Sequence, residues 1–271
     1  MMMRVRVVSL FPEMVDTGVG FGVCGRALTR GLAEVVAINP RDFAQDVHRT
    51  VDDRPYGGGP GMVLKVEPVQ GAIRAARAQL PAGARVVFLG PQGRRFDQAL
   101  ARDMAGWGAL VLVCGRYEGF DERLLETEAD CEISLGDFVL SGGELAALAV
   151  IDAVVRLLPG ALGDEGSAQA DSFGDDLLDC PHYTRPEVLG DGRSVPDVLL
   201  EGNHEAIRRW RLKQALGRTQ LRRPDLLRRR VLSVEERQLL GEYLAEHRAQ
   251  ARNFNDPEPV AAADHDEGEG L

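Results

Sequence analysis

The chain has 271 residues, 44% of them hydrophobic and 27% charged, which fits about two domains of a globular protein and excludes a disordered, collagen-like or small disulfide-scaffold chain. No pair of its four cysteines forms a C-x-x-C motif, and no run of about 18 uncharged apolar residues occurs, so we expect no membrane span and reduced thiols in the cytoplasm. The net charge of −10 is uneven, because residues 255–271 hold six acids and no Lys or Arg, whereas residues 208–230 hold ten basic residues and one acid.

Apolar runs in the first 160 residues predict buried strands that alternate with helices. The expected strands are residues 4–10, 35–38, 85–89 and 109–113, and the expected helices are residues 67–79, 95–104 and a long apolar helix that begins at 141–144 and ends at 159–160. Continuous apolar runs suit strands that are buried on both faces. The alternation predicts an α/β fold with a parallel sheet in a domain of residues 1–162.

The composition changes after residue 162. Residues 163–176 are rich in Gly, Asp and Ser, which is typical of a flexible linker. Residues 177–254 form the second predicted domain, with basic helical patterns at 203–216, 224–231 and 234–252. Residues 255–271 are acidic, lack a hydrophobic period, and are predicted to be a disordered tail.

Four glycine-containing segments are the first candidates for a binding site: residues 52–61, 89–93, 114–123 and 134–144. The last three follow predicted strands or short apolar segments, and ligands in open α/β folds lie beyond the carboxyl ends of strands. Glycine also allows the backbone to approach a ligand closely. The alternatives are a surface loop for the first segment and tight turns between strand and helix for the others. No nicotinamide or ATP fingerprint motif occurs.

Residues after the first domain suggest contact with RNA. Trp210 lies within the basic run 208–230, which favours phosphate contacts over a merely solvated helix face. His182 lies in an aromatic and basic segment before that run, and without a second His or Cys at ligand spacing we expect it to bind no metal. Arg156 and Asp171, taken alone, are more consistent with structural roles. Together these features predict a nucleotide-like pocket joined to a nucleic-acid-binding region, and they leave the reaction open.

The spaced motifs, taken together, resemble those of the bacterial tRNA (guanine-N1)-methyltransferases of the SPOUT class. The resemblance runs from about residue 4 to the last helix and leaves only the acidic tail outside it. The segments that carry it are residues 9–13, 25–26, 40–43, 48–62, 91–93, 114–119, 136–137, 139–144, 171–173, 178–186 and 208–213.

The resemblance implies a SPOUT-type parallel sheet with a deep C-terminal trefoil knot, followed by a small, mainly helical domain. It also implies a homodimer with shared active sites and S-adenosylmethionine as methyl donor, held largely by backbone groups. The residues that match the family's donor-binding positions are Leu89, Gly115, Leu135, Gly136, Asp137, Phe138, Val139 and Leu140.

The implied reaction is methylation of N1 of the guanosine immediately 3′ of a tRNA anticodon, which maintains the reading frame. Guanine N1 carries a proton at neutral pH, so a general base must remove it, and the charge that develops toward O6 needs a cation nearby. By resemblance, Asp171 takes the proton and Arg156 supports the charge. A linker that orders on RNA binding would complete the site only when substrate is present.

Further contacts are implied with less detail. The expected substrate-binding residues are His48, Asp52, Arg116, Tyr117, Glu118 and His182. The family uses Mg²⁺, for which Glu118 is the candidate ligand near the donor. Two alternatives stay open: a SPOUT methyltransferase that modifies another RNA position, and a tRNA-binding protein without enzymatic activity.

Overall fold

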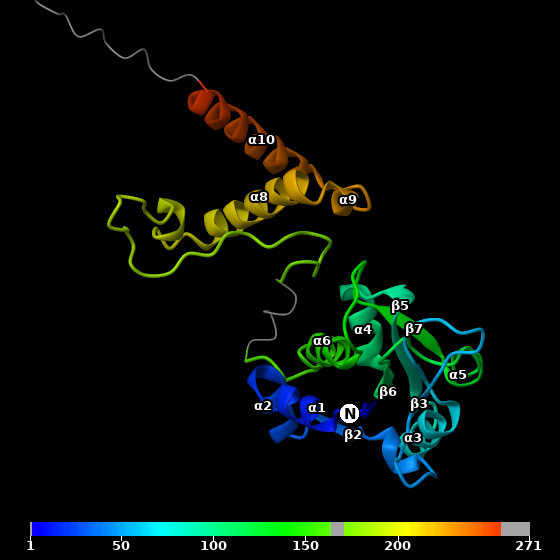
Figure 1. The fold of residues 1–271 in the computed structure, drawn as a ribbon. Helices are drawn as coiled ribbons and strands as arrows, with labels where there is room; N and C mark the ends of the chain where they lie inside the picture. Colours follow the sequence, from blue (N-terminus) through cyan, green and yellow to red (C-terminus); the bar gives the residue numbers. More distant parts are fainter. Residues whose placement is uncertain (1, 164–170, 256–271) are drawn as a thin grey trace, which may run out of the picture. The chain divides into compact units, whose positions relative to one another are not determined.

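The structure, a computed structural model, describes residues 2–163 and 171–255, without the side chains of residues 250–255. Residues 164–170, half of the predicted linker, and all but the first residue of the predicted acidic tail therefore lie outside the described residues. The chain divides into two compact units, Met1–Gln169 and Ala170–Leu271. Figure 1 shows the sheet and its helices in the first unit and a group of helices in the second.

The first unit is built on a five-stranded sheet in the order β2-β1-β6-β5-β7. All four neighbouring pairs are parallel, so the predicted α/β fold with a parallel sheet is confirmed. The strands are β1 (Met3–Val8), β2 (Ala33–Ile38), β5 (Arg85–Arg95), β6 (Ala109–Cys114) and β7 (Cys131–Ser134).

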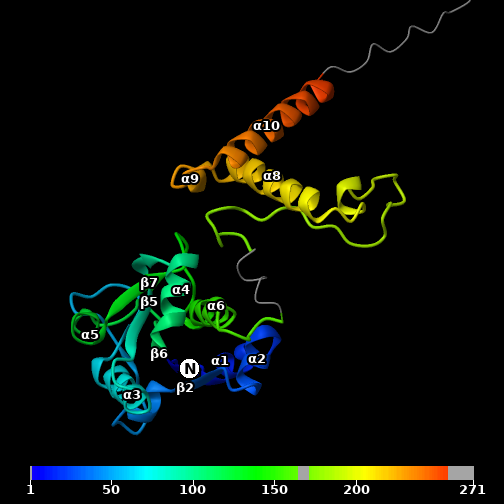
Figure 2. The same cartoon turned by 180° about the vertical axis from the view of Figure 1, so that it is seen from behind.

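Helices cover both faces of this sheet (Figure 2). Successive side chains of a strand point to opposite faces, and in β5 Val87 and Leu89 join one hydrophobic core while Val86 and Phe88 join the other. The helices packed on the first core are α1 (Pro12–Val19), α2 (Gly22–Thr29), α4 (Gln98–Trp107) and α6 (Glu144–Val155). Those on the second are α3 (Val66–Ala78) and α5 (Glu122–Glu128), beside the short 3-10 helix η1 (Pro40–Phe43).

Some elements differ from the sequence prediction. α4 begins three residues later than predicted because β5 continues through Arg95, and Asp97 then caps the helix by accepting a hydrogen bond from the amide of Leu100 at 2.9 Å. α1, α2, α5 and β7 were not predicted. The glycine-rich segment connects a short antiparallel pair, β3 (Asp52–Asp53) and β4 (Val63–Leu64).

The described part of the second unit has turns and loops over residues 171–196 and helices in most of the remainder. It contains η2 (Asp197–Leu199), α8 (His204–Arg222), α9 (Pro224–Leu227) and α10 (Val234–Asn255). Its core joins α8, α9 and α10 through Leu216, Leu227 and Leu239. Across the residues that the structure describes, no helix combines the length and hydropathy needed to span a bilayer.

Candidate functional site

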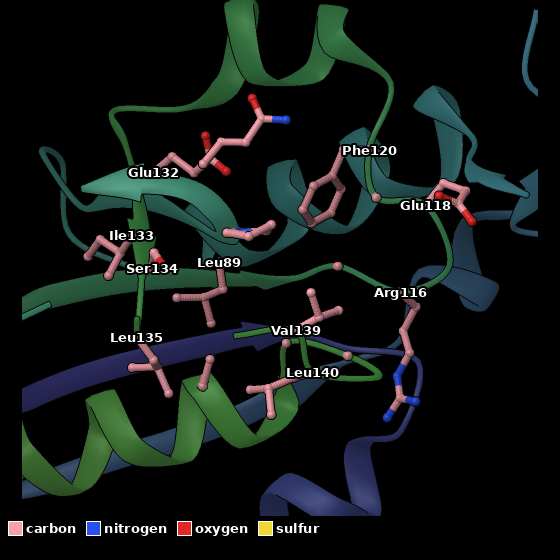
Figure 3. Close-up of a pocket in the computed structure, with 18 of the residues that line it drawn as sticks. Leu89, Arg116, Glu118, Phe120, Glu132, Ile133, Ser134, Leu135, Val139 and Leu140 are labelled. Atoms are coloured by element: carbon pink, nitrogen blue, oxygen red, sulfur yellow. The ribbon is translucent and has the colours of Figure 1, made fainter. Parts of the chain in front are cut away.

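A cavity of 370 Å³ opens beside the middle of β5 and the carboxyl ends of β6 and β7. Most of its lining comes from three segments: residues 89–92 within β5, where its register shifts, residues 115–120 after β6, and residues 132–143 except Asp137, from the end of β7 to the start of α6. Figure 3 shows the apolar side chains of Leu89, Val139 and Leu140 within this pocket, with Glu132 and Glu118 on opposite sides of it. The pocket therefore lies where an open parallel sheet places its ligands.

Backbone forms much of the pocket wall because six of the lining residues are glycines. A Cβ on Gly143 would lie 2.7 Å from the Cα of Cys114 and 3.0 Å from the amide nitrogen of Gly115. Gly136 has a backbone φ of +152°, a conformation that residues with a side chain rarely adopt. Because Gly143 has no side chain, the segment before α6 can approach the end of β6 this closely. Backbone N–H and C=O groups are therefore available to a ligand in this part of the pocket.

The segment after β6, residues 115–120, is hydrogen-bonded to its neighbours on two sides. The amide of Leu64 donates to the carbonyl of Gly119 at 3.0 Å, and the amide of Gly143 donates to the carbonyl of Gly115 at 2.8 Å. Tyr117, between these contacts, has a φ of +61°. A bulky residue in the left-handed region costs about 1–3 kcal/mol, and such strain gathers at functional sites.

A buried ion pair holds Arg116 at the edge of the pocket. Nε and Nη2 of Arg116 each lie 3.0 Å from Oε2 of Glu144, which is fully buried at the start of α6. Oε1 of Glu144 accepts a hydrogen bond from the Ser9 hydroxyl at 2.9 Å, and the Arg116 guanidinium lies over the ring of Phe11 at 4.4 Å. Sequence analysis gave no role to Ser9 or Glu144. Both residues lie in segments that carry the resemblance, residues 9–13 and 139–144, but nothing in the sequence indicated that the two side chains meet.

Other ionisable groups at the pocket are acidic or inert. Glu118, Glu122 and Glu132 line it, and burial followed by the nearby Glu122 carboxylate raises the pKa of Glu132. Burial raises the pKa of the Cys114 thiol, and the Glu144 carboxylate raises it further. Cys114 therefore stays protonated at neutral pH and is no nucleophile.

The structure brings most of the predicted donor-binding residues to this pocket. Leu89, Gly115, Leu135, Gly136, Phe138, Val139 and Leu140 line it, and Asp137 does not. Of the predicted substrate-binding residues, Arg116, Tyr117 and Glu118 line it as well. His48 and Asp52 belong to the same unit without lining the pocket, and Arg156 caps the C-terminus of α6.

The remaining predicted residues, Asp171 and His182, belong to the second unit. Nε2 of His182 lies 2.8 Å from Oδ2 of Asp179, and the ligand atoms of Asp179, Cys180 and His182 all lie within 4.8 Å of one another. The premise that no Cys lies at ligand spacing from His182 is therefore wrong, because Cys180 is only two residues away, and the absence of a metal at His182 stays a prediction. Burial acts to raise the pKa of Asp179, but hydrogen bonds from His182 and from the amide of Cys180 hold it below its ordinary value.

The basic run of the second unit is partly neutralised within the unit. Arg208 and Arg209 contact Glu235 at 2.6 and 2.9 Å, and Lys213 contacts Glu246 at 2.8 Å. Trp210 packs with Tyr183 at a ring separation of 6.2 Å. The exposed arginines of this run that have no ion pair among the described residues are Arg211, Arg222, Arg228 and Arg229. These four side chains are the best placed to meet phosphates.

Comparison with known proteins identifies the family. Residues 3–229 match the profile described as "tRNA (Guanine-1)-methyltransferase TrmD". A protein of Halorhodospira halophila named tRNA (guanine-N(1)-)-methyltransferase is 61% identical over 253 residues, which cover 93% of this chain and 96% of that protein.

Two further relatives carry the same name. The Methylococcus capsulatus protein is 62% identical over 92% of this chain and 98% of its own length. The Pasteurella multocida protein is 58% identical over 90% of this chain and all of its own length. With a family profile matched over most of its length and relatives of this identity, the chain belongs to the tRNA (guanine-1)-methyltransferase family.

Proposed function

We propose that this protein transfers a methyl group from S-adenosylmethionine to N1 of the guanosine immediately 3′ of a tRNA anticodon, and so supports reading-frame maintenance. The observation that best supports the proposal is the glycine-lined pocket beside the middle of β5 and the carboxyl ends of β6 and β7. The names of the relatives, tRNA (guanine-N(1)-)-methyltransferase, support the RNA class, the base and the ring nitrogen.

The pocket suits the proposed methyl donor. Leu89, Ile133 and Leu140 give it apolar walls, and the close approach at Gly143 leaves backbone groups to bind the polar edge of an adenine. When bound, S-adenosylmethionine supplies an electrophilic methyl group. Seven of the predicted donor-binding residues line the pocket, and we assign Asp137 a place beside it rather than in its wall.

Two charged residues share the proton chemistry in this proposal. Asp171 accepts the N1 proton of guanine, which turns a poor nucleophile into a good one. Arg156 stabilises the negative charge that develops toward O6. Its position at the C-cap of α6 suits a cation, because the helix dipole is negative at that end.

Other residues bind and orient the RNA. We assign Arg116, Tyr117 and Glu118 to the target nucleotide because they line the pocket, and His48, Asp52 and His182 to the RNA around it. Mg²⁺ at Glu118 would need oxygen ligands from water or substrate, because no cluster of three ligand side chains in the described part of the chain includes Glu118. This is the coordination that Mg²⁺ prefers.

The proposal extends to the chain path and the assembly. We propose the deep trefoil knot because the family's motifs imply it; the hydrogen bonds that hold residues 115–120 against residues 62–64 and Gly143 bring distant chain segments together at the pocket. We also propose a homodimer with shared active sites, at work in the cytoplasm. The helical unit binds tRNA through the four exposed arginines of the basic run, Arg211, Arg222, Arg228 and Arg229.

The test is methyl transfer from labelled S-adenosylmethionine to two unmodified tRNA transcripts, one with guanosine and one with adenosine 3′ of the anticodon. We expect transfer to the guanosine transcript alone and its loss in Asp171→Asn. Transfer to both transcripts would place the target elsewhere in the RNA. Binding of tRNA without any transfer, or without binding of the methyl donor in a titration, would favour a binding protein.

A further inference from the structure

The segment that carries Asp171 is folded into the helical unit. The amide of Gly174 donates to the carbonyl of Asp171 at 2.9 Å, and the amide of Phe173 donates to the carbonyl of Leu177 at 2.7 Å. Phe173 has a φ of +68°, so the segment turns sharply at this point. Residues 171–177 therefore have a defined conformation of their own, although their composition is that of a linker.

One arginine fastens this segment to the helices. Nη1 of Arg230 donates to the carbonyl of Asp175 at 2.6 Å and lies 2.8 Å from its carboxylate oxygen Oδ2. Nη2 of the same side chain contacts Glu236 in the first turn of α10. The Arg230 side chain is 18% exposed and that of Glu236 10%, so water screens this contact less than it screens a surface ion pair. The Asp175 carboxylate is 77% exposed, so the hydrogen bond to the Asp175 carbonyl is the firmer of the two contacts at that residue.

The partner of Arg230 on α10 is itself fixed. The amide of Ser233 donates to Oε2 of Glu236 at 2.7 Å, and the amide of Glu236 donates to the Ser233 hydroxyl at 3.1 Å. This reciprocal pair is a capping box, which fixes the start of a helix. Arg230 thus connects the turn at Asp175 to a rigid helix terminus.

Three further contacts hold the same segment. The Ser172 hydroxyl accepts a hydrogen bond from the amide of Asp179 at 3.0 Å. The Thr219 hydroxyl, buried on α8, accepts one from the amide of Leu178 at 2.9 Å. The Arg223 guanidinium lies over the ring of Phe173 at 5.8 Å.

We propose that Arg230 is a positioning residue for Asp171. By holding the turn at Asp175 against α10, it makes the proposed general base part of the same unit as the exposed arginines of α8 and of the segment that follows α9. The Asp171 carboxylate, which removes the N1 proton in this proposal, then moves together with the RNA-binding arginines when the unit binds tRNA. The inference rests on the proposed function of Asp171, but the attachment of residues 171–177 to α10 through Arg230 can be measured without any methyl transfer.

Hydrogen exchange of the full protein without RNA tests the fastening directly. We expect the amides of Phe173, Gly174 and Asp179 to exchange at least tenfold more slowly than in an unstructured chain, because each donates a hydrogen bond. Arg230→Ala should remove this protection while the amides within α8 stay protected. Unprotected amides in the wild-type protein would overturn the proposal.

Kinetics test the consequence for catalysis. Arg230→Ala should lower the single-turnover rate of methyl transfer at least tenfold at saturating tRNA. The matched control is Arg248→Ala, which removes the same charge from an exposed side chain of α10, outside the basic run 208–230 and without an ion pair among the described residues, and should leave the rate unchanged. Arg230→Lys keeps the charge and should recover part of the rate. Equal rates in the two alanine variants would contradict a positioning role.

A second pair of variants covers the case in which Arg230→Ala unfolds the unit. Asp175→Asn removes the carboxylate that pairs with Arg230. The control is Asp176→Asn, the same change at an exposed neighbouring residue that has no ion pair in the described structure. We expect a lower rate in Asp175→Asn alone, with an unchanged melting temperature. If the wild-type protein transfers no methyl group to tRNA, the proposed function fails, while hydrogen exchange still decides whether Arg230 holds the segment.

Discussion

The buried carboxylate of Glu144 offers the sharpest test of the energetics of the pocket. Its side chain is fully buried and accepts hydrogen bonds from Ser9 and Arg116. Glu144→Gln removes the negative charge but keeps a side chain of nearly the same shape. The positive charge of Arg116 then remains without its partner, with only 21% of its side chain exposed to water.

The expected loss follows from these contacts. Removing one partner of a buried ion pair costs about 3–5 kcal/mol in the free energy of unfolding. Glutamine still offers one acceptor oxygen to Arg116, and the exposed part of that side chain can be hydrated, so we expect about 3 kcal/mol, the lower end of that range. For a unit of this size, such a loss lowers the melting temperature by about 6–12 °C.

Urea unfolding followed by tryptophan fluorescence measures this loss. In a Trp210→Phe background the remaining tryptophan is Trp107 in the first unit, so its emission follows that unit alone. The control is Glu126→Gln, the same change at an exposed position of α5, which should alter the free energy of unfolding by less than about 0.5 kcal/mol. Equal unfolding midpoints for Glu144→Gln and Glu126→Gln would refute the reasoning.

Three further predictions concern glycine, acid stability and thiol reactivity. Gly143→Ala would place a Cβ 2.7 Å from the backbone of β6, so it should destabilise the first unit by about 1–3 kcal/mol and weaken donor binding, as calorimetry would show. Arg223 lowers the pKa of Asp225 to about 2 through a side-chain hydrogen bond. This contribution to stability is present above the ordinary value of 3.8 and is lost as pH falls toward 2; Asp225→Asn should flatten acid unfolding across that window, and an unchanged curve would contradict it. Burial, followed by Asp152, raises the pKa of Cys24 to about 12, so Cys24 should resist alkylation at pH 8 in the folded protein, and rapid labelling there would show the assignment to be wrong.

The sequence predicted the sheet where the strands are long and buried. β6 is buried at every residue, and such a run has few other interpretations. β7 escaped prediction because it has four residues, of which only Ile133 and Ser134 are buried. Its identity as a strand comes from pairing with β5, which is a long-range contact that local pattern does not contain.

The same limit applies to the site. Glycine segments at strand ends marked the pocket, because a backbone conformation that needs glycine is visible in the sequence. The pair formed by Ser9 and Glu144 was not visible, since 135 residues separate the two side chains and each is unremarkable alone. Arg230 was counted as one more basic residue, and its contact with Asp175 follows only from how the second unit folds.

The identity of the methylated nucleoside is the most direct test of the proposed function. An unmodified tRNA transcript with guanosine 3′ of the anticodon would be incubated with the wild-type protein and S-adenosylmethionine, digested to nucleosides, and examined by chromatography and mass spectrometry. We predict 1-methylguanosine as the product, and none with Asp171→Asn. A guanosine methylated at another ring position, or a 2′-O-methylated nucleoside, would contradict the assignment of Asp171 as the base that deprotonates N1.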